Sequence, residues 1–284
     1  KKNWMYSMFY KPSLENRLLP IQVYLPAFVQ DNPFIDPEYL TQLKSTTDKA
    51  KRERLLNGNW EYDDNPYKLC IYDKILRLFD KNVHIVNSKE KYITADVARF
   101  GSDKAVIGVW HDWELIEVHE FDISKITEIQ NCIKALQIKH SIPADHCIAD
   151  ADGVGGGVVD NLDIIGFNNG GRPYDEDLGD EKETPKYKNA QTQLLVYLAE
   201  KIINQSKMRI SAELGSQQIE DIKEELDSIE KDPNVDGCIA LMNKAHIKEQ
   251  LGRSPDYRDM ILMRAYFDYN KPIRNNLKSI ASFI

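Results

Sequence analysis

The sequence has no long apolar run. Nowhere does an apolar stretch approach the ~20 residues that a helix needs to cross a bilayer, and the mean hydropathy is −0.51. Residues 1–6 are basic but lead into aromatic and polar residues, without the apolar stretch and cleavage site of a secretion signal. We therefore expect neither a membrane protein nor a secreted one.

Cysteine is scarce, with four residues in 284. Cys70, Cys132, Cys147 and Cys238 lie far apart and form no C-x-x-C pair, which argues against a zinc knuckle and against a disulfide framework. Reduced thiols in a cytoplasm fit this pattern best.

Positive charge is in deficit, since 37 Lys and Arg stand against 45 Asp and Glu, for a net charge of −8. Tight binding of nucleic acid over a whole surface needs many Lys and Arg side chains on phosphates, and this sequence does not supply them. Any contact with DNA is expected to be local, transient or helped by a partner.

What is present is enough apolar content, 42%, to fill a real core. Residues 1–65 carry five prolines among aromatics and show little strand alternation, so we expect a linking segment, with a helix over 37–60. Residues 66–284 are expected to form the main domain. Residues 166–188, rich in Gly, Asp, Glu and Pro, predict a surface insert.

Within the main domain, the pattern predicts strands and helices in an α/β order. Alternating apolar residues over 92–96, 105–110 and 115–121 predict three consecutive strands that form an antiparallel meander. A helix from residue 124 and a buried strand over 147–150 follow. Further helices are predicted over 189–204, 216–229 and 257–267, with short strands over 208–210 and 238–241.

Four aspartates stand where an α/β sheet collects ligands. Asp96 and Asp150 each end a predicted strand, and a run of glycines, residues 153–157, follows Asp150. Asp256 and Asp259 stand three apart at the start of a helix and share one face. Taken singly, each has a plain explanation: a turn, a cap, or an acid that complements the helix dipole.

Taken together, these aspartates come from two strands and one helix start, which is what hard Mg²⁺ or Mn²⁺ ions require. Two ions roughly 4 Å apart can activate a water and stabilise the leaving oxygen of a phosphodiester. No nucleophilic side chain is then needed.

Three stretches resemble the acidic motifs of the nuclease domain of tailed-phage large terminases, and they occur in the same order. They are residues 92–110 (YITADVARFGSDKAVIGVW), 147–162 (CIADADGVGGGVVDNL) and 254–262 (SPDYRDMIL). Residues 189–203 are similar to the helix after that family's variable insert, and residues 24–60 to the segment that joins its ATPase motor to its nuclease.

The resemblance implies an RNase H-like mixed sheet with helices on both faces, and an endonuclease that cuts double-stranded DNA during genome packaging. It implies that Asp96, Asp150 and Asp259 are catalytic metal ligands, with Asp256 a fourth. Arg99 and Lys104, beside the first motif, are expected to contact DNA. The implied partners are the portal and the small terminase subunit, and the implied location is the host cytoplasm.

One departure from the full-length family is the absence of a G-x-x-x-x-G-K-[ST] motif, because no glycine is followed by lysine. We therefore expect the nuclease part without its motor.

Three other functions stay open. A RuvC-like resolvase shares the chemistry, an actin-like or sugar-kinase-like ATPase would use residues 153–157 for phosphates, and a docking module would bind proteins without catalysis. The six histidines show no ligand spacing and are assigned no role.

Overall fold

In a computed structural model, the protein is described over residues 5–45, 55–58, 60, 65–83, 85, 89–98, 104–122, 125–152, 155–174 and 186–269. It divides into two compact units, Lys1–Pro66 and Tyr67–Ile284. No helix in these ranges is long and apolar enough to span a membrane.

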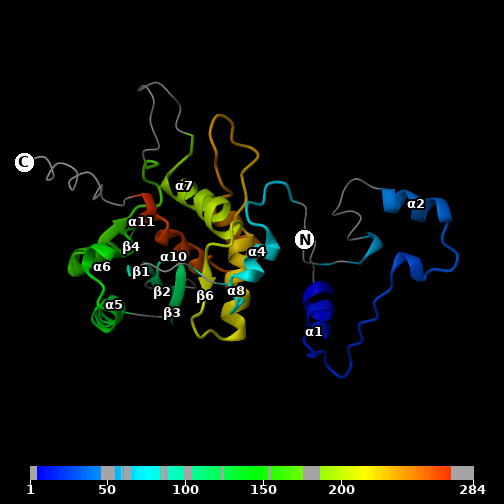
Figure 1. Ribbon diagram of the computed structural model, residues 1–284, viewed down its shortest axis with the longest axis horizontal. Coiled ribbons are helices and arrows are strands. Elements are labelled where there is room, and N and C mark those ends of the chain that lie inside the picture. Colours follow the sequence, from blue (N-terminus) through cyan, green and yellow to red (C-terminus); the bar gives the residue numbers. More distant parts are fainter. Residues whose placement is uncertain are drawn as a thin grey trace, which may run out of the picture. The chain divides into compact units, whose positions relative to one another are not determined.

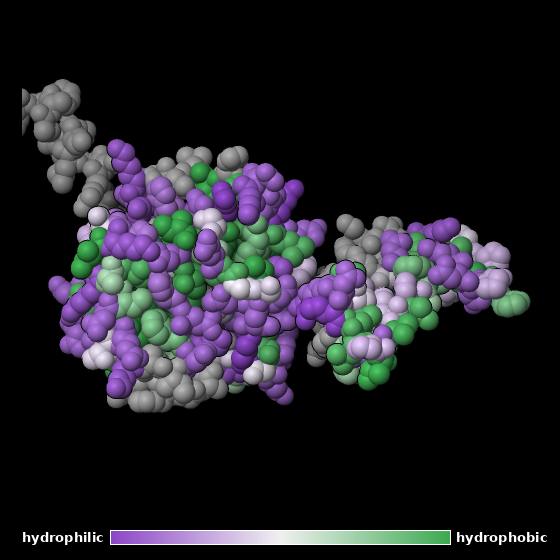
Figure 2. Space-filling view, turned by 90° about the horizontal axis from the view of Figure 1, so that it is seen from below, coloured by the Kyte–Doolittle hydropathy of each residue, from purple (hydrophilic) through white to green (hydrophobic). Residues whose placement is uncertain are grey.

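The first unit consists of short helices: η1 (Tyr6–Tyr10), α1 (Lys11–Leu14), η2 (Val29–Asp31) and α2 (Pro37–Ser45). Helix α2 begins at Pro37, as predicted, because the Asp36 carboxylate accepts the Glu38 N–H and proline suits a first helical turn. Residues 46–54, over which the helix was expected to continue, lie outside the described ranges. Ile21, Leu25 and Phe34 are largely exposed, and apolar patches are visible on this unit in Figure 2. Its role as a linker stays a prediction.

The second unit is built on a six-stranded mixed sheet with the order β5-β4-β1-β2-β3-β6 (Figure 1). Strands β1 (Lys91–Asp96), β2 (Ala105–His111) and β3 (Glu114–Phe121) form the predicted antiparallel meander. Strand β4 (Cys147–Asp150) lies parallel to β1, and β5 (Ile165–Phe167) lies parallel to β4. At the other edge, β6 (Arg209–Ile210) pairs in parallel with β3.

Helices cover both faces of this sheet, so the expected α/β fold class is confirmed. On one face, α5 (Ile126–His140) and α6 (Gly156–Leu162) pack on the side chains of Ile93, Ala95 and Ala149. The core on the other face of the sheet includes Tyr92, Trp110 and Ile148. The helices that cover this face are α4 (Tyr72–Arg77), α7 (Ala190–Tyr197), η5 (Leu198–Ile203), α8 (Ser216–Asp227), α10 (Asp256–Arg264) and α11 (Tyr266–Tyr269).

Helix α10 lies against β1 and β2, and its close contact with β2 depends on Gly108, which has no side chain. A Cβ atom added to Gly108 in β2 would stand 2.4 Å from the Met260 sulfur of α10, closer than real contacts allow. Glycine at this position therefore brings the acidic start of α10 down to the strand ends.

Three expectations about elements need correction. Residues 238–241 do not form a strand; only the isolated bridges of Ile239 with Tyr187 and of Leu241 with Lys231 occur there. The helix predicted over 257–267 is two helices, α10 and α11. Strand β5 and helices α4 and α9 (Lys244–Leu251) were not predicted.

An ionic cluster joins α5 to β3 and includes two of the histidines that were assigned no role. The Glu117 carboxylate contacts Lys139 Nζ, His140 Nε2 and His119 Nε2, each at 2.8 Å. Although partial burial raises the pKa of Glu117, the hydrogen bonds from these three side chains lower it to about 2. The charged form of Glu117 therefore stabilises the fold.

We expect Glu117→Gln to lower the free energy of unfolding by ~1 kcal/mol near neutral pH. Because the folded pKa lies below the ordinary value of 4.5, this contribution is present above pH 4.5 and is lost as the pH falls toward 2. Urea unfolding at a series of pH values measures the difference from the wild type. Asp160→Asn, which removes an exposed charge on α6, is the matched control. A difference that does not shrink in acid would contradict the assignment.

Candidate active site

Asp96 and Asp150 lie at the carboxyl ends of neighbouring parallel strands. The register pairs Ala95 with Ala149, so Asp96 and Asp150 follow at equivalent positions. Side chains alternate along a strand, and both aspartates therefore face the α10 side of the sheet, as Thr94 and Ile148 do. Pairing of the two strand ends, which the sequence only suggested, is thus part of the fold.

The turn after Asp150 is tight. A Cβ atom at Gly155 would lie 1.7 Å from the carbonyl oxygen of Asp150, so only glycine fits at this position. The Asp152 N–H donates to the Asp150 carboxylate at 3.0 Å, which fixes the direction of that side chain. Glycine at position 155 thus allows the chain to pass close to the backbone of Asp150.

Both strand-end carboxyls are disfavoured in their charged form. Burial raises the pKa of Asp96 well above its usual range, and the nearby carboxylates of Asp259, Asp256 and Asp150 raise it further, while Lys244 lowers it. Burial also raises the pKa of Asp150, to about 6, against the lowering effect of the Asp152 N–H. A cation placed among these groups would relieve both effects.

Helix α10 contributes the other two predicted aspartates, both of them buried. Asp256, in its first turn, accepts the backbone N–H of Lys104 at 2.9 Å, which ties the helix start to the beginning of β2. Asp259 lies one turn further along α10. Its negative charge is among the effects that raise the pKa of Asp96. The structure thus brings all four predicted aspartates into one electrostatically coupled group.

Asp259 lies between two cations. One of its oxygens accepts from Arg258 Nε at 3.0 Å and Nη2 at 2.7 Å, and the other accepts from Lys244 Nζ at 2.8 Å. Although burial raises the pKa of Asp259, Arg258 and Lys244 outweigh it and hold that pKa below its usual range. Asp259 therefore keeps its charge, in contrast to Asp96 and Asp150, whose pKa values are raised.

Lys244 is a site residue that the sequence analysis missed. It is the first residue of α9, whose N-cap is the Asn243 side chain. Burial alone would lower the pKa of Lys244, but Asp259 and Asp96 raise it. An asparagine N-cap before a helix marks the helix start and says nothing of an active site, so no sequence signal pointed to Lys244.

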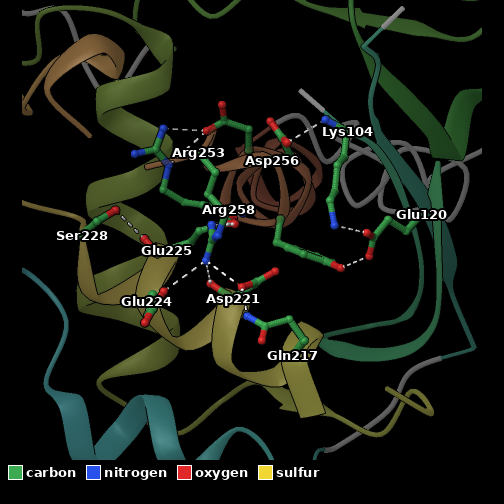
Figure 3. A network of polar contacts seen from close by, with 12 residues as sticks. Lys104, Glu120, Gln217, Asp221, Glu224, Glu225, Ser228, Arg253, Asp256 and Arg258 are labelled. Atoms are coloured by element: carbon green, nitrogen blue, oxygen red, sulfur yellow. Dashed lines mark hydrogen bonds and ion pairs between the residues drawn. The ribbon is translucent and has the colours of Figure 1, made fainter. Parts of the chain in front are cut away.

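A second network of polar contacts, shown in Figure 3, connects the start of α10 with α8. The Glu225 carboxylate of α8, 1% exposed, accepts the backbone N–H of Arg258 at 2.9 Å. Arg253 bonds Glu225 and also contacts Asp221 and Glu224 of α8, at 3.0 and 3.3 Å. This network fixes the helix turn on which both aspartates stand.

Of the two residues predicted to contact DNA, the structure describes Lys104 but not Arg99. The Lys104 ammonium pairs with Glu120 (Figure 3). It also lies 3.6 Å from Asp122, and Glu120 accepts the Tyr257 hydroxyl as well. The Lys104 side chain is thus part of a link between β2, β3 and α10. Arg99 lies outside the described residues. A contribution of either residue to DNA binding stays a prediction.

The donors gathered here suit a hard divalent cation, because all four are carboxylates. Within the described ranges, however, no three His, Cys, Asp or Glu side chains are already grouped as metal ligands. The Lys244 ammonium supplies positive charge among the aspartates instead. The residue types fit Mg²⁺ or Mn²⁺, and the positive charge that such a cation would supply is carried here by Lys244.

The fold is that of terminase nuclease domains. The nuclease domain of the large terminase subunit gp2 of bacterial virus Sf6 superposes with a TM-score of 0.57 at 20% identity, covering 70% of this chain and 98% of that domain. A mutant of that domain, crystallised with manganese and beta-thujaplicinol, gives a TM-score of 0.56 at the same identity and coverage. The same mutant in a structure with calcium also gives 0.56.

At this level of identity the comparison establishes the fold alone, a mixed sheet with helices on both faces as the motifs implied. No protein-family model matches the chain, and no curated protein matches it in sequence.

Proposed function

We propose that this chain is the nuclease part of a large terminase subunit, a metal-dependent endonuclease that cuts double-stranded DNA during phage genome packaging. The observation that carries the proposal is that Asp96, Asp150 and Asp259, which lie far apart in the sequence, come near enough in the fold for the charges of Asp150 and Asp259 to raise the pKa of Asp96. The fold that brings them together is shared with the Sf6 domain.

In this proposal, Asp96, Asp150 and Asp259 hold Mg²⁺ or Mn²⁺, and Asp256 is a fourth ligand. Two bound ions would activate a water and neutralise the leaving oxygen of the phosphodiester. The chain itself supplies the carboxylate oxygens, with Arg258 orienting Asp259 and the Asp152 N–H orienting Asp150. Entry of a divalent ion has to displace the Lys244 ammonium from Asp259.

The remaining assignments follow from the same proposal. The portal and the small terminase subunit are the proposed partners in a full-length protein, and the host cytoplasm is the proposed location. A RuvC-like resolvase would share the chemistry but cut branched DNA. The ATPase alternative, which would use residues 153–157 for phosphates, is disfavoured because it gives no role to Asp256 and Asp259, whose charges act on Asp96.

The test is cleavage of supercoiled plasmid by the purified chain. We expect nicked and linear DNA with Mn²⁺ or Mg²⁺ and none with EDTA. Because the contacts available at such a site are to phosphates, we expect little sequence preference and a steep loss of DNA binding as salt rises. Defined bands from a linear substrate of mixed sequence would contradict the low specificity, and no cutting with either metal would refute the proposal itself.

A branched substrate separates the nearest rival. A terminase-type nuclease is expected to cut linear duplex and a four-way junction at similar rates. Cutting confined to the junction would favour the resolvase.

A further inference from the structure

A hollow of about 160 Å³ opens beside Asp259 and is lined by Lys188, Asn189, Gln191, Asn243, Lys244 and Arg258, among others. It lies between the start of α7, the start of α9 and α10. One water needs only ~15 Å³ of such space, so a larger polar group has room here.

The charge of this hollow is opposite to that of the protein as a whole. The chain carries a net charge of −8, yet three cationic side chains and no carboxylate line the hollow. Two of the cations, Lys244 and Arg258, bind Asp259 and so connect the hollow with the candidate metal centre. The third, Lys188, is exposed and forms no ion pair with any residue of the described ranges.

The neutral side chains of the hollow also offer donors. Asn189 and Asn243 use their amide oxygens to cap α7 and α9, each accepting a backbone N–H at 2.9 Å. Capping occupies the oxygen of each amide, and the NH₂ group remains a donor. The lining therefore offers Lys188 as a cation that is not paired with Asp259, two cations that are paired with it, and amide donors, and this combination favours a phosphate.

We propose that this hollow binds a backbone phosphate of the DNA strand next to the phosphate that is cut. This inference rests on the proposed function, because a neighbouring phosphate has a place only if the strand passes the aspartates. Lys188 is the residue that distinguishes the hollow from the metal centre, since it touches none of the four aspartates in the described contacts.

The experiment compares Lys188→Ala with Lys134→Ala, which removes an exposed lysine of α5 on the other face of the sheet. Steady-state cutting of a linear duplex gives kcat and KM, and fluorescence anisotropy with the same duplex in metal-free buffer gives the affinity at several salt concentrations. For Lys188→Ala we expect KM and Kd to rise about 3- to 10-fold with kcat unchanged. The slope of log K against log salt should become shallower by about 1, and Lys134→Ala should match the wild type.

Three results would overturn the inference: an unchanged salt slope for Lys188→Ala, an equal effect of Lys134→Ala, or a fall in kcat with KM unchanged. Weaker binding of inorganic phosphate without weaker binding of duplex would also overturn it, since the hollow would then hold a free anion. The anisotropy arm needs no catalysis, so failure of the wild type to cut DNA refutes the proposed function and leaves this test of the hollow intact.

Discussion

Asp96→Asn is expected to abolish plasmid cutting and to leave a protein at least as stable as the wild type. Cutting should fall by at least ~10²-fold, because the variant loses a charged ligand at the centre of the coupled group. The stability should not fall, because burial and the neighbouring carboxylates already oppose the charge of Asp96 in the folded protein. A gain of ~1 kcal/mol would raise Tm by about 2–4 °C in a domain of this size.

Asp150→Asn should behave in the same way, with a smaller gain in stability, since Asp150 is less buried and its pKa is raised only to about 6. Cutting is measured with Mn²⁺, and Tm is measured with and without the metal. A rise of Tm on adding Mn²⁺ should occur in the wild type and disappear in both variants. Asp160→Asn on α6 is the control for loss of one carboxylate. A normal rate of cutting in either variant would show that the proposed centre is wrong.

Asp259→Asn is expected to abolish cutting as well, but with the opposite effect on stability. Its carboxylate is the partner of both Arg258 and Lys244, and Arg258 is only 4% exposed. Loss of that charge leaves a buried guanidinium without its counter-ion, which is strongly destabilising. We therefore expect a lower Tm together with loss of Mn²⁺ binding.

Asp256→Asn should remain partly active. The contact of Asp256 with the Lys104 N–H needs only an oxygen acceptor, and asparagine keeps one. Calorimetric titration with Mn²⁺ and cutting assays compare the two variants, and Asp259→Glu, which retains the charge, guards against a result caused only by unfolding. Equal loss in both asparagine variants would reverse the ranking. Anomalous peaks beside Asp256, with Asp259 turned away, would do the same.

The sequence alone determined the elements that carry the site. Alternation over 92–96 and the buried run over 147–150 predicted β1 and β4 with an aspartate at the end of each, and these strands are confirmed. The helix that carries Asp259, with Asp256 at its start, was also predicted, although its break before α11 was not. Such signals are local, because the periodicity of a strand or a helix can be recognised within a short stretch of consecutive residues.

Only the tertiary structure decided what surrounds these aspartates. Lys244 lies 15 residues from Asp259, and Glu225 lies 33 residues from Arg258, so no local period connects them. Residues 238–241 show a related failure: their apolar character predicted a strand, but the chain there forms only isolated bridges. Strand pairing and burial of charge depend on which elements pack together. That packing, made close by Gly108 beneath Met260, is what brings α10 with Asp256 and Asp259 against the sheet that carries Asp96 and Asp150.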